Sequence, residues 1–266
     1  MEASAGTERT SASRGRTIAF RVIAAIAGLA AAAFSIPLAL LAPFDTGPDQ
    51  IHRIHYIAGG LGFGLLTGVP LLLSAWRPDR WIAAFHLAIA SSVAVLVGGL
   101  LSGDLVAGGY VYQVVVAAVL IALHPYRGEV VSVRSPSVPL AVLSILALIP
   151  AVAYLLTWSE MQRTAAVGDP HAELHHYSGM AITGIGFALA GIAVAARGSG
   201  WRIAAWFVGF SWAAMGVASL AWPEHVSAFD SPWAWASIAF GVAFVGVAEW
   251  QARSAPRTGA PNVTAR

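Results

Sequence analysis

The sequence predicts an all-α protein that crosses a membrane several times. Of its 266 residues, 58% are hydrophobic and only 11% are charged, whereas soluble domains carry roughly a quarter charged residues. The apolar residues form eight runs, each about long enough to cross a hydrocarbon layer of about 30 Å as a helix. Arginines fall in alternate connections between the runs. We therefore expect eight transmembrane helices.

The eight runs define the expected helices and leave a polar tail at each end. The runs are 18–41, 55–75, 81–101, 106–124, 139–157, 176–196, 203–221 and 233–250. Gly108 and Gly109 interrupt the fourth run. Residues 1–16 and 254–266 lack an apolar period, which indicates disordered tails. The first run exceeds the about 7–15 apolar residues of a cleaved signal peptide, so we expect it to be retained as a helix.

The arginines indicate which way the helices run. With the N-terminus inside, thirteen of the fifteen basic residues fall in cytoplasmic segments, and only Arg53 and Arg163 fall in outer loops. Positively charged residues concentrate in cytoplasmic loops of membrane proteins. This bias predicts a multi-pass protein of the cell membrane with both termini in the cytoplasm.

An internal repeat divides the helices into two halves, 17–135 and 136–253. Ile54-His55-Tyr56 opens the second run, and His175-His176-Tyr177 opens the sixth. Asp104 and Glu224 fall at corresponding places near the ends of the third and seventh runs. Because each half has an even number of helices, the halves would be parallel, related by an axis along the membrane normal.

Most histidines and acids fall at the outer boundary in this topology. The outer histidines are His52, His55, His171, His175, His176 and His225. Residues three or four apart share a helix face. His52 with His55, and Glu173 with His176, are therefore two pairs in equivalent places. His171 and His175 would also share a face if the sixth helix extended that far.

This pattern fits a divalent metal such as Zn²⁺, which imidazole and carboxylate groups bind. The expected ligands are His52, His55, Glu173 and His176. A bound metal could activate water for hydrolysis of a lipid or lipid-linked substrate, with Asp104 or Glu224 as the base. Whether the protein is an enzyme stays open at this point, because interfacial histidines and acids also cap helices and bind water.

Two other functions remain open. His86 and His124 lie toward the inner side of adjacent helices, and together with His55 and His176 they could ligate two b-type haems in an electron conduit. Alternatively, the chain could be a non-enzymatic, transporter-like or scaffolding helix bundle, with the lipid bilayer as its partner.

Several function classes are excluded by composition. Cysteine is absent, which excludes disulfides and thiol chemistry, and every basic residue is Arg. Without Lys there is no P-loop and no lysine Schiff base. The arginines form no continuous patch, so we expect no nucleic-acid partner.

Gly60, Gly64 and Gly68 recur every four residues in the second run. Small residues at this spacing let helices approach closely, so we expect the second helix to have an interior position.

The outer segment before the second helix resembles a known family. Pro43-Phe44-Asp45 followed by His52 and His55 at a helix start is similar to an uncharacterised bacterial multi-pass membrane family related to the Frag/DRAM/Sfk proteins. The resemblance covers the first two or three helices, and it implies a multi-pass fold but no particular activity. The spacing of His171 and His175 is similar to that in alkaline-ceramidase-like membrane hydrolases, as an analogy only.

Overall fold

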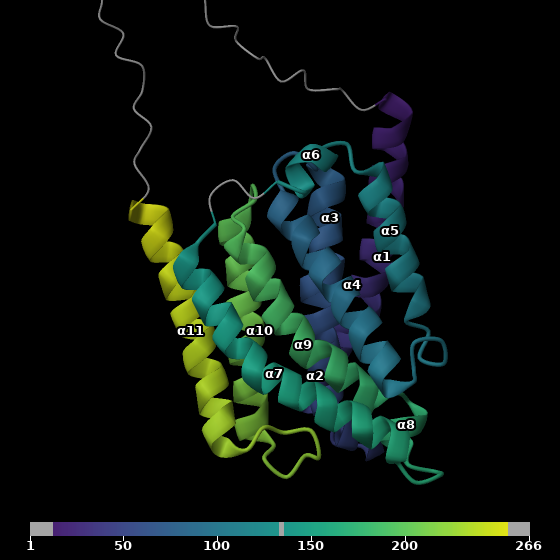
Figure 1. Ribbon diagram of the computed structural model, residues 1–266. Coiled ribbons are helices and arrows are strands. Elements are labelled where there is room, and N and C mark those ends of the chain that lie inside the picture. Colours follow the sequence, from purple (N-terminus) through teal and green to yellow (C-terminus); the bar gives the residue numbers. More distant parts are fainter. Residues whose placement is uncertain (1–12, 133–135, 255–266) are drawn as a thin grey trace, which may run out of the picture.

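The computed structural model describes residues 13–132 and 136–254, which form a helical bundle with no strand among them (Figure 1). Seven of its helical segments are long and apolar enough to cross a membrane, and an eighth apolar helix is shorter. The prediction of an all-α polytopic membrane protein is therefore confirmed. Of the predicted tails, 1–16 and 254–266, residues 1–12 and 255–266 lie outside the described residues. The prediction is wrong at the inner edges, because Arg14 begins α1 and Ser254 is the last residue of α11.

The long helices are α1 (Arg14–Leu41), α4 (Ile82–Ser102), α7 (Val138–Thr164), α9 (His176–Ala195), α10 (Trp201–Ala221) and α11 (Ser231–Ser254). The second span is composite and consists of α2 (Arg53–Gly59), η3 (Gly60–Gly68) and α3 (Val69–Trp76). The short apolar helix is α5 (Val111–Leu123). Single turns at the ends of the bundle are η1 (Ala42–Phe44), η2 (Pro48–His52), α6 (Arg127–Val130) and α8 (Pro170–Glu173).

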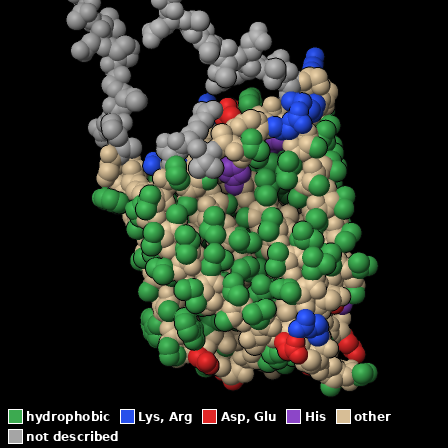
Figure 2. Space-filling view, in the orientation of Figure 1, with side chains coloured by type: hydrophobic (Ala, Val, Ile, Leu, Met, Phe, Trp, Pro, Cys, Tyr) green, Lys and Arg blue, Asp and Glu red, His purple; other side chains and the backbone are tan. Residues whose placement is uncertain are grey.

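The surface of the bundle is divided into an apolar middle and charged ends. On the face shown in Figure 2, hydrophobic side chains cover the middle, whereas charged side chains gather at the two ends. Large apolar residues such as Phe34 and Ile149 are more than 70% exposed. Water would not solvate so much contiguous apolar surface, so the middle of the bundle is the part that contacts lipid.

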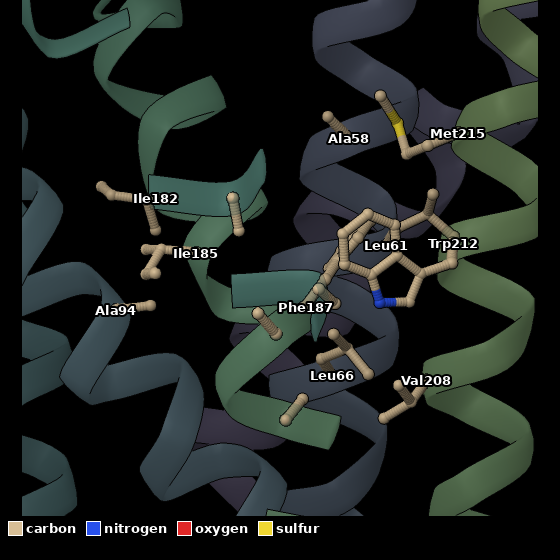
Figure 3. Close-up of a cluster of buried hydrophobic side chains, with 14 of the residues drawn as sticks. Ala58, Leu61, Leu66, Ala94, Ile182, Ile185, Phe187, Val208, Trp212 and Met215 are labelled. Carbon is tan, nitrogen blue, oxygen red and sulfur yellow. The ribbon is translucent and has the colours of Figure 1, made fainter. Parts of the chain in front are cut away.

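The core lies among four central segments, namely the second span, α4, α9 and α10. Figure 3 shows Leu61, Ala94, Phe187 and Trp212, one from each segment, converging on this core. The other helices pack around it: α1 lies against η3 and α3, α5 against α4, α7 against α9, and α11 against α10. Each predicted half thus has the same neighbour pattern, although the duplication itself stays a prediction.

The glycines of the second span allow a close contact with α1. A Cβ atom added at Gly68 would lie 2.7 Å from the backbone nitrogen of Ala32, and one at Gly60 would lie 2.2 Å from the Cβ of Ala39. The predicted close approach at these glycines is therefore confirmed. The nine residues Gly60–Gly68, which include these glycines, form the π-helix η3. A π-helix is a wider coil than the α-helix that the four-residue spacing of the glycines predicts.

The fourth predicted helix is shorter than expected. The run was predicted to be helical over 106–124, but α5 begins only at Val111. Gly109 has a φ of 71° in the preceding turn, a conformation that favours glycine. The chain between Asp104 and Tyr110 is therefore a loop, held by hydrogen bonds from the amide of Gly108 to the carbonyl of Asp104 (2.8 Å) and from the amide of Val111 to the carbonyl of Leu105 (3.0 Å).

We expect Gly68→Ala to destabilise the bundle by roughly 1–3 kcal/mol, because the added methyl group meets the backbone of α1, which cannot rotate away. Unfolding in a graded denaturing detergent, followed by circular dichroism, measures this change. Gly59→Ala is the matched control, since nothing lies within 4 Å of a Cβ at that position. Equal stability of the two variants would contradict the close contact.

Candidate metal centre

The helix α8 lies at one end of the bundle (Figure 1). Five histidine rings, one of them on α8, lie close to one another. We call them the histidine cluster: His52, His55, His171, His176 and His225. Ring centroids are 4.5 Å apart for His52 and His176, 4.6 Å for His55 and His176, and 5.0 Å for His55 and His225. His171 lies 4.9 Å from His52 and 5.0 Å from His55. Residues from three distant parts of the chain therefore build one site.

The first two rings come from the entry to the second span. His52 is the last residue of η2, and His55 lies in the first turn of α2. Both side chains are buried, and their ring centroids are 6.1 Å apart. The two rings therefore lie near each other, although the residues belong to two successive helical segments and not to one helix face as the spacing predicts. Arg53 between them turns the other way, where its guanidinium lies over the ring of Trp222, 5.5 Å from the centroid.

His171 and His176 come from α8 and α9, which are separate helices. Asp169 caps α8, and its Oδ1 accepts hydrogen bonds from the amides of His171 (2.8 Å) and Ala172 (3.2 Å). Burial acts to raise the pKa of Asp169, but these hydrogen bonds outweigh it and lower the pKa. The hydroxyl of Tyr177 donates to Oδ2 of the same carboxylate (3.2 Å), and the Tyr177 ring stacks on that of His171.

A break at His175 changes the expected pairing on this segment. His175 has a φ of 57°, in the left-handed region, and α9 begins only at the next residue. His171 and His175 therefore do not share the face of one extended helix, as the spacing had suggested. Glu173 and His176 likewise lie on different helices. Glu173 is exposed and does not belong to the group of possible ligands around His176, whereas His171 contacts that group.

Three members of the histidine cluster could hold a metal ion together. One ring nitrogen from each of His52, His55 and His176 lies within 4.8 Å of the other two. Nδ1 of His55 and Nδ1 of His176 are buried and have no hydrogen-bond partner among the described residues. Nε2 of His55 is 2.6 Å from Oγ of Ser227. This contact orients the His55 ring and leaves its Nδ1 available as the ligand atom.

His225 completes the histidine cluster from the loop between α10 and α11. Its Nδ1 accepts a hydrogen bond from the amide of Ser227 (3.1 Å). Burial, with a smaller effect of the nearby His171 and His52, lowers the pKa of His225 to about 4. The ring is therefore uncharged at neutral pH. The sequence placed His225 on the outer face but gave no spacing that would pair it with the other histidines.

The two acids considered as bases have different environments. Oδ2 of Asp104 is 3.0 Å from Nδ1 of His175, and Asp104 is buried at the end of α4. Glu224, at the corresponding place in the second half, is exposed beside His225. The structure thus joins Asp104 to a histidine outside the histidine cluster.

A cavity of about 670 Å³ lies beside the histidine cluster, between α1, α2, η3, α5 and α9. His55, His175 and His176 line it, and most of its remaining wall is apolar. A molecule in this cavity would reach both the possible metal ligands and the histidine that Asp104 holds.

His86 and His124 are the inner pair considered for haem. Other residues of the protein contact both of their rings. Nε2 of His86 is 2.7 Å from the carbonyl oxygen of Val130. His124 is fully buried between Phe20 and Phe85, and each ring centroid is 4.6 Å from its own.

The outer pair is packed too closely for haem. Axial imidazoles lie on opposite sides of a porphyrin, whereas the rings of His55 and His176 are 4.6 Å apart with no gap for a macrocycle between them. The haem alternative has no support from either pair.

The pKa of His225 predicts a pH effect on the metal-free protein. The unfolded chain takes up a proton near pH 6.5, but the folded chain does so only near pH 4. The stability contributed by His225 is therefore complete above pH 6.5 and is lost as the pH falls toward 4. We expect the unfolding temperature of His225→Gln to fall less over this pH range than that of the unchanged protein. Parallel curves would contradict the assignment.

The chain was compared with known protein families, curated proteins and solved structures. No protein-family model, curated protein or solved structure matches the chain. The resemblance of the first helices to relatives of the Frag/DRAM/Sfk proteins accordingly stays a prediction. The histidine cluster and the cavity beside it are the features from which a function can be argued.

Proposed function

We propose that this protein is a metal-dependent membrane enzyme whose divalent ion is bound by His52, His55 and His176. The observation that carries the proposal is the convergence of three ring nitrogens within 4.8 Å of one another. Zn²⁺ holds imidazole nitrogens at about 2.0–2.1 Å, so a bound ion would draw these nitrogens slightly closer.

The ligand set favours a catalytic ion over a purely structural one. Structural zinc sites are usually closed by four protein ligands, often thiolates, whereas catalytic sites commonly combine three protein ligands with water. Here three imidazoles meet next to a cavity that His55 and His176 line. A water molecule bound to the ion on the cavity side would be activated as a nucleophile. His171 and His225 are near enough to orient that water or to serve as additional ligands.

A proton acceptor is available in the same cavity. His175 lines the cavity, and Asp104 holds its Nδ1. A carboxylate that fixes one ring nitrogen leaves the other to exchange protons with a substrate. We propose that Asp104 acts through His175 and not directly on the substrate. Glu224 remains the second candidate, because it lies on the loop that carries His225.

The arginine distribution gives the proposed orientation. If the positive-inside bias holds, both termini lie in the cytoplasm of a cell-membrane protein, and the histidine cluster lies at the outer surface. The enzyme would then act on substrates of the outer leaflet. A lipid or lipid-linked molecule is the substrate class that such a position and such a cavity favour.

Metal analysis tests the ligand set. Protein purified in mild detergent and dialysed after addition of zinc should retain about one ion per chain by mass spectrometric metal analysis. We expect His55→Gln to lose most of this metal, because the variant removes one of three ligands. His86→Gln is the control at the other end of the bundle and should retain it. Absence of a stoichiometric divalent metal in the unchanged protein would falsify the proposal.

The contact between Ser227 and His55 predicts that a change at Ser227 also weakens metal binding, but less than a change at His55 does. We expect Ser227→Ala to lower zinc affinity by roughly 10–100-fold, as loss of a group that orients a ligand usually does. Competition with a fluorescent zinc chelator measures this affinity. Ser237→Ala is the matched control, since that buried serine donates to the carbonyl of Trp212 within the bundle. The role of Ser227 is ruled out if both variants bind zinc as the unchanged protein does.

A further inference from the structure

The cavity beside the histidine cluster is much larger than a metal ion and a water molecule require. We propose that it binds one long apolar chain of a membrane lipid, which enters sideways between α1 and α5 and places its polar end at the histidine cluster. This inference rests on the proposed function, because it names the substrate class of the same site.

The cavity has one polar end and a long apolar wall. His55, His175 and His176 mark the polar end. Phe34, Leu38, Phe63 and Met180 supply apolar surface to the same cavity. A molecule that satisfies both parts must itself be an amphiphile, because a wholly polar solute would leave the apolar wall in contact with water.

The volume fits one chain. A water-sized group occupies roughly 30 Å³, so a cavity of about 670 Å³ accommodates on the order of twenty methylene-sized groups. That matches a single long chain with a small polar end.

Exposed side chains locate the entrance on the lipid-facing side. Phe34 is 76% exposed and Leu38 is 37% exposed, and they lie four residues apart on α1. Tyr112 of α5, on the opposite side of the cavity, is 54% exposed. Because α5 begins only at Val111, the loop with Gly108 and Gly109 replaces the helical wall that a full-length helix would give. A chain can therefore pass from the bilayer into the cavity without crossing water.

Gln113 provides a polar contact inside the cavity. This residue lines the cavity, is only 8% exposed, and its Nε2 has no hydrogen-bond partner among the described residues. A buried amide without a partner is costly. Nε2 itself is buried, so a ligand oxygen in the cavity would satisfy it after a rotation of the Gln113 side chain. The carbonyl oxygen of an acyl lipid is such an acceptor. The recognised class is thus an acyl lipid, in preference to a plain hydrocarbon.

Binding of a fluorescent monoacylglycerol with a polyene chain tests this inference. The full-length protein is held in an amphipathic polymer, so that no detergent competes for the cavity. We expect saturable binding. Leu38→Trp should weaken it at least tenfold by filling the entrance, equivalent to about 1.4 kcal/mol. Ile26→Trp is the matched control, since this α1 residue is 64% exposed and does not line the cavity. It should leave binding unchanged.

Gln113→Leu gives a second, smaller test. Loss of one hydrogen bond should weaken binding of the same probe by roughly two- to tenfold. Binding that Leu38→Trp and Gln113→Leu leave intact would overturn the proposal. So would a dimer, seen by light scattering, that Leu38→Trp dissociates, because a second copy of the chain would then occupy the entrance.

The same preparations separate this inference from the proposed metal function. Probe binding is measured before and after treatment with a chelator, and metal content is measured in parallel. Metal binding without probe binding refutes the lipid site alone. Probe binding by a chain that never binds metal refutes the metal enzyme but supports the cavity as a lipid site.

Discussion

The uncharged state of its imidazoles is the condition on which the histidine cluster depends. Ring centroids of His52, His55 and His176 lie 4.5–6.1 Å apart, in a largely buried setting. Two protonated rings at such a distance would repel each other strongly, because little water screens them. A metal ion also requires neutral imidazole. The packing of the folded chain and the proposed binding of a metal ion therefore depend on the same protonation state.

The rest of the bundle brings the three parts of the site together. The close contact of α1 with the second span fixes one wall of the cavity and the helix that begins near His55. The core between the second span, α9 and α10 sets the distance between that helix and His176 (Figure 3). Ser227 then joins the loop after α10 to His55. A site made of such distant segments requires most of the fold to be in place.

The sequence predicts the helices better than it predicts the site. Composition and the length of the apolar runs are enough for the membrane fold, and the spacing of His52 and His55 locates two of the three histidines that could hold a metal ion. The spacing pairs Glu173 with His176, and His171 with His175, only if the helix is unbroken. The left-handed conformation of His175 breaks it, and the spacing of the residues does not reveal that break. The link between Ser227 and His55 spans 172 residues and has no local pattern. The π-helical coil at Gly60–Gly68 is likewise not predicted by the regular spacing of its glycines.

The thirteen residues of α5 also affect the bilayer itself. At 1.5 Å per residue, such a helix is about 20 Å long, whereas the hydrocarbon layer is about 30 Å thick. A short span is accommodated by local thinning of the bilayer, by flanking residues that reach the interface, or by oligomerisation. Thinning would bring the lipids beside α5 toward the middle of the membrane, at the side of the protein where the proposed entrance lies. It would also shorten the distance that a headgroup travels to leave its leaflet at that point.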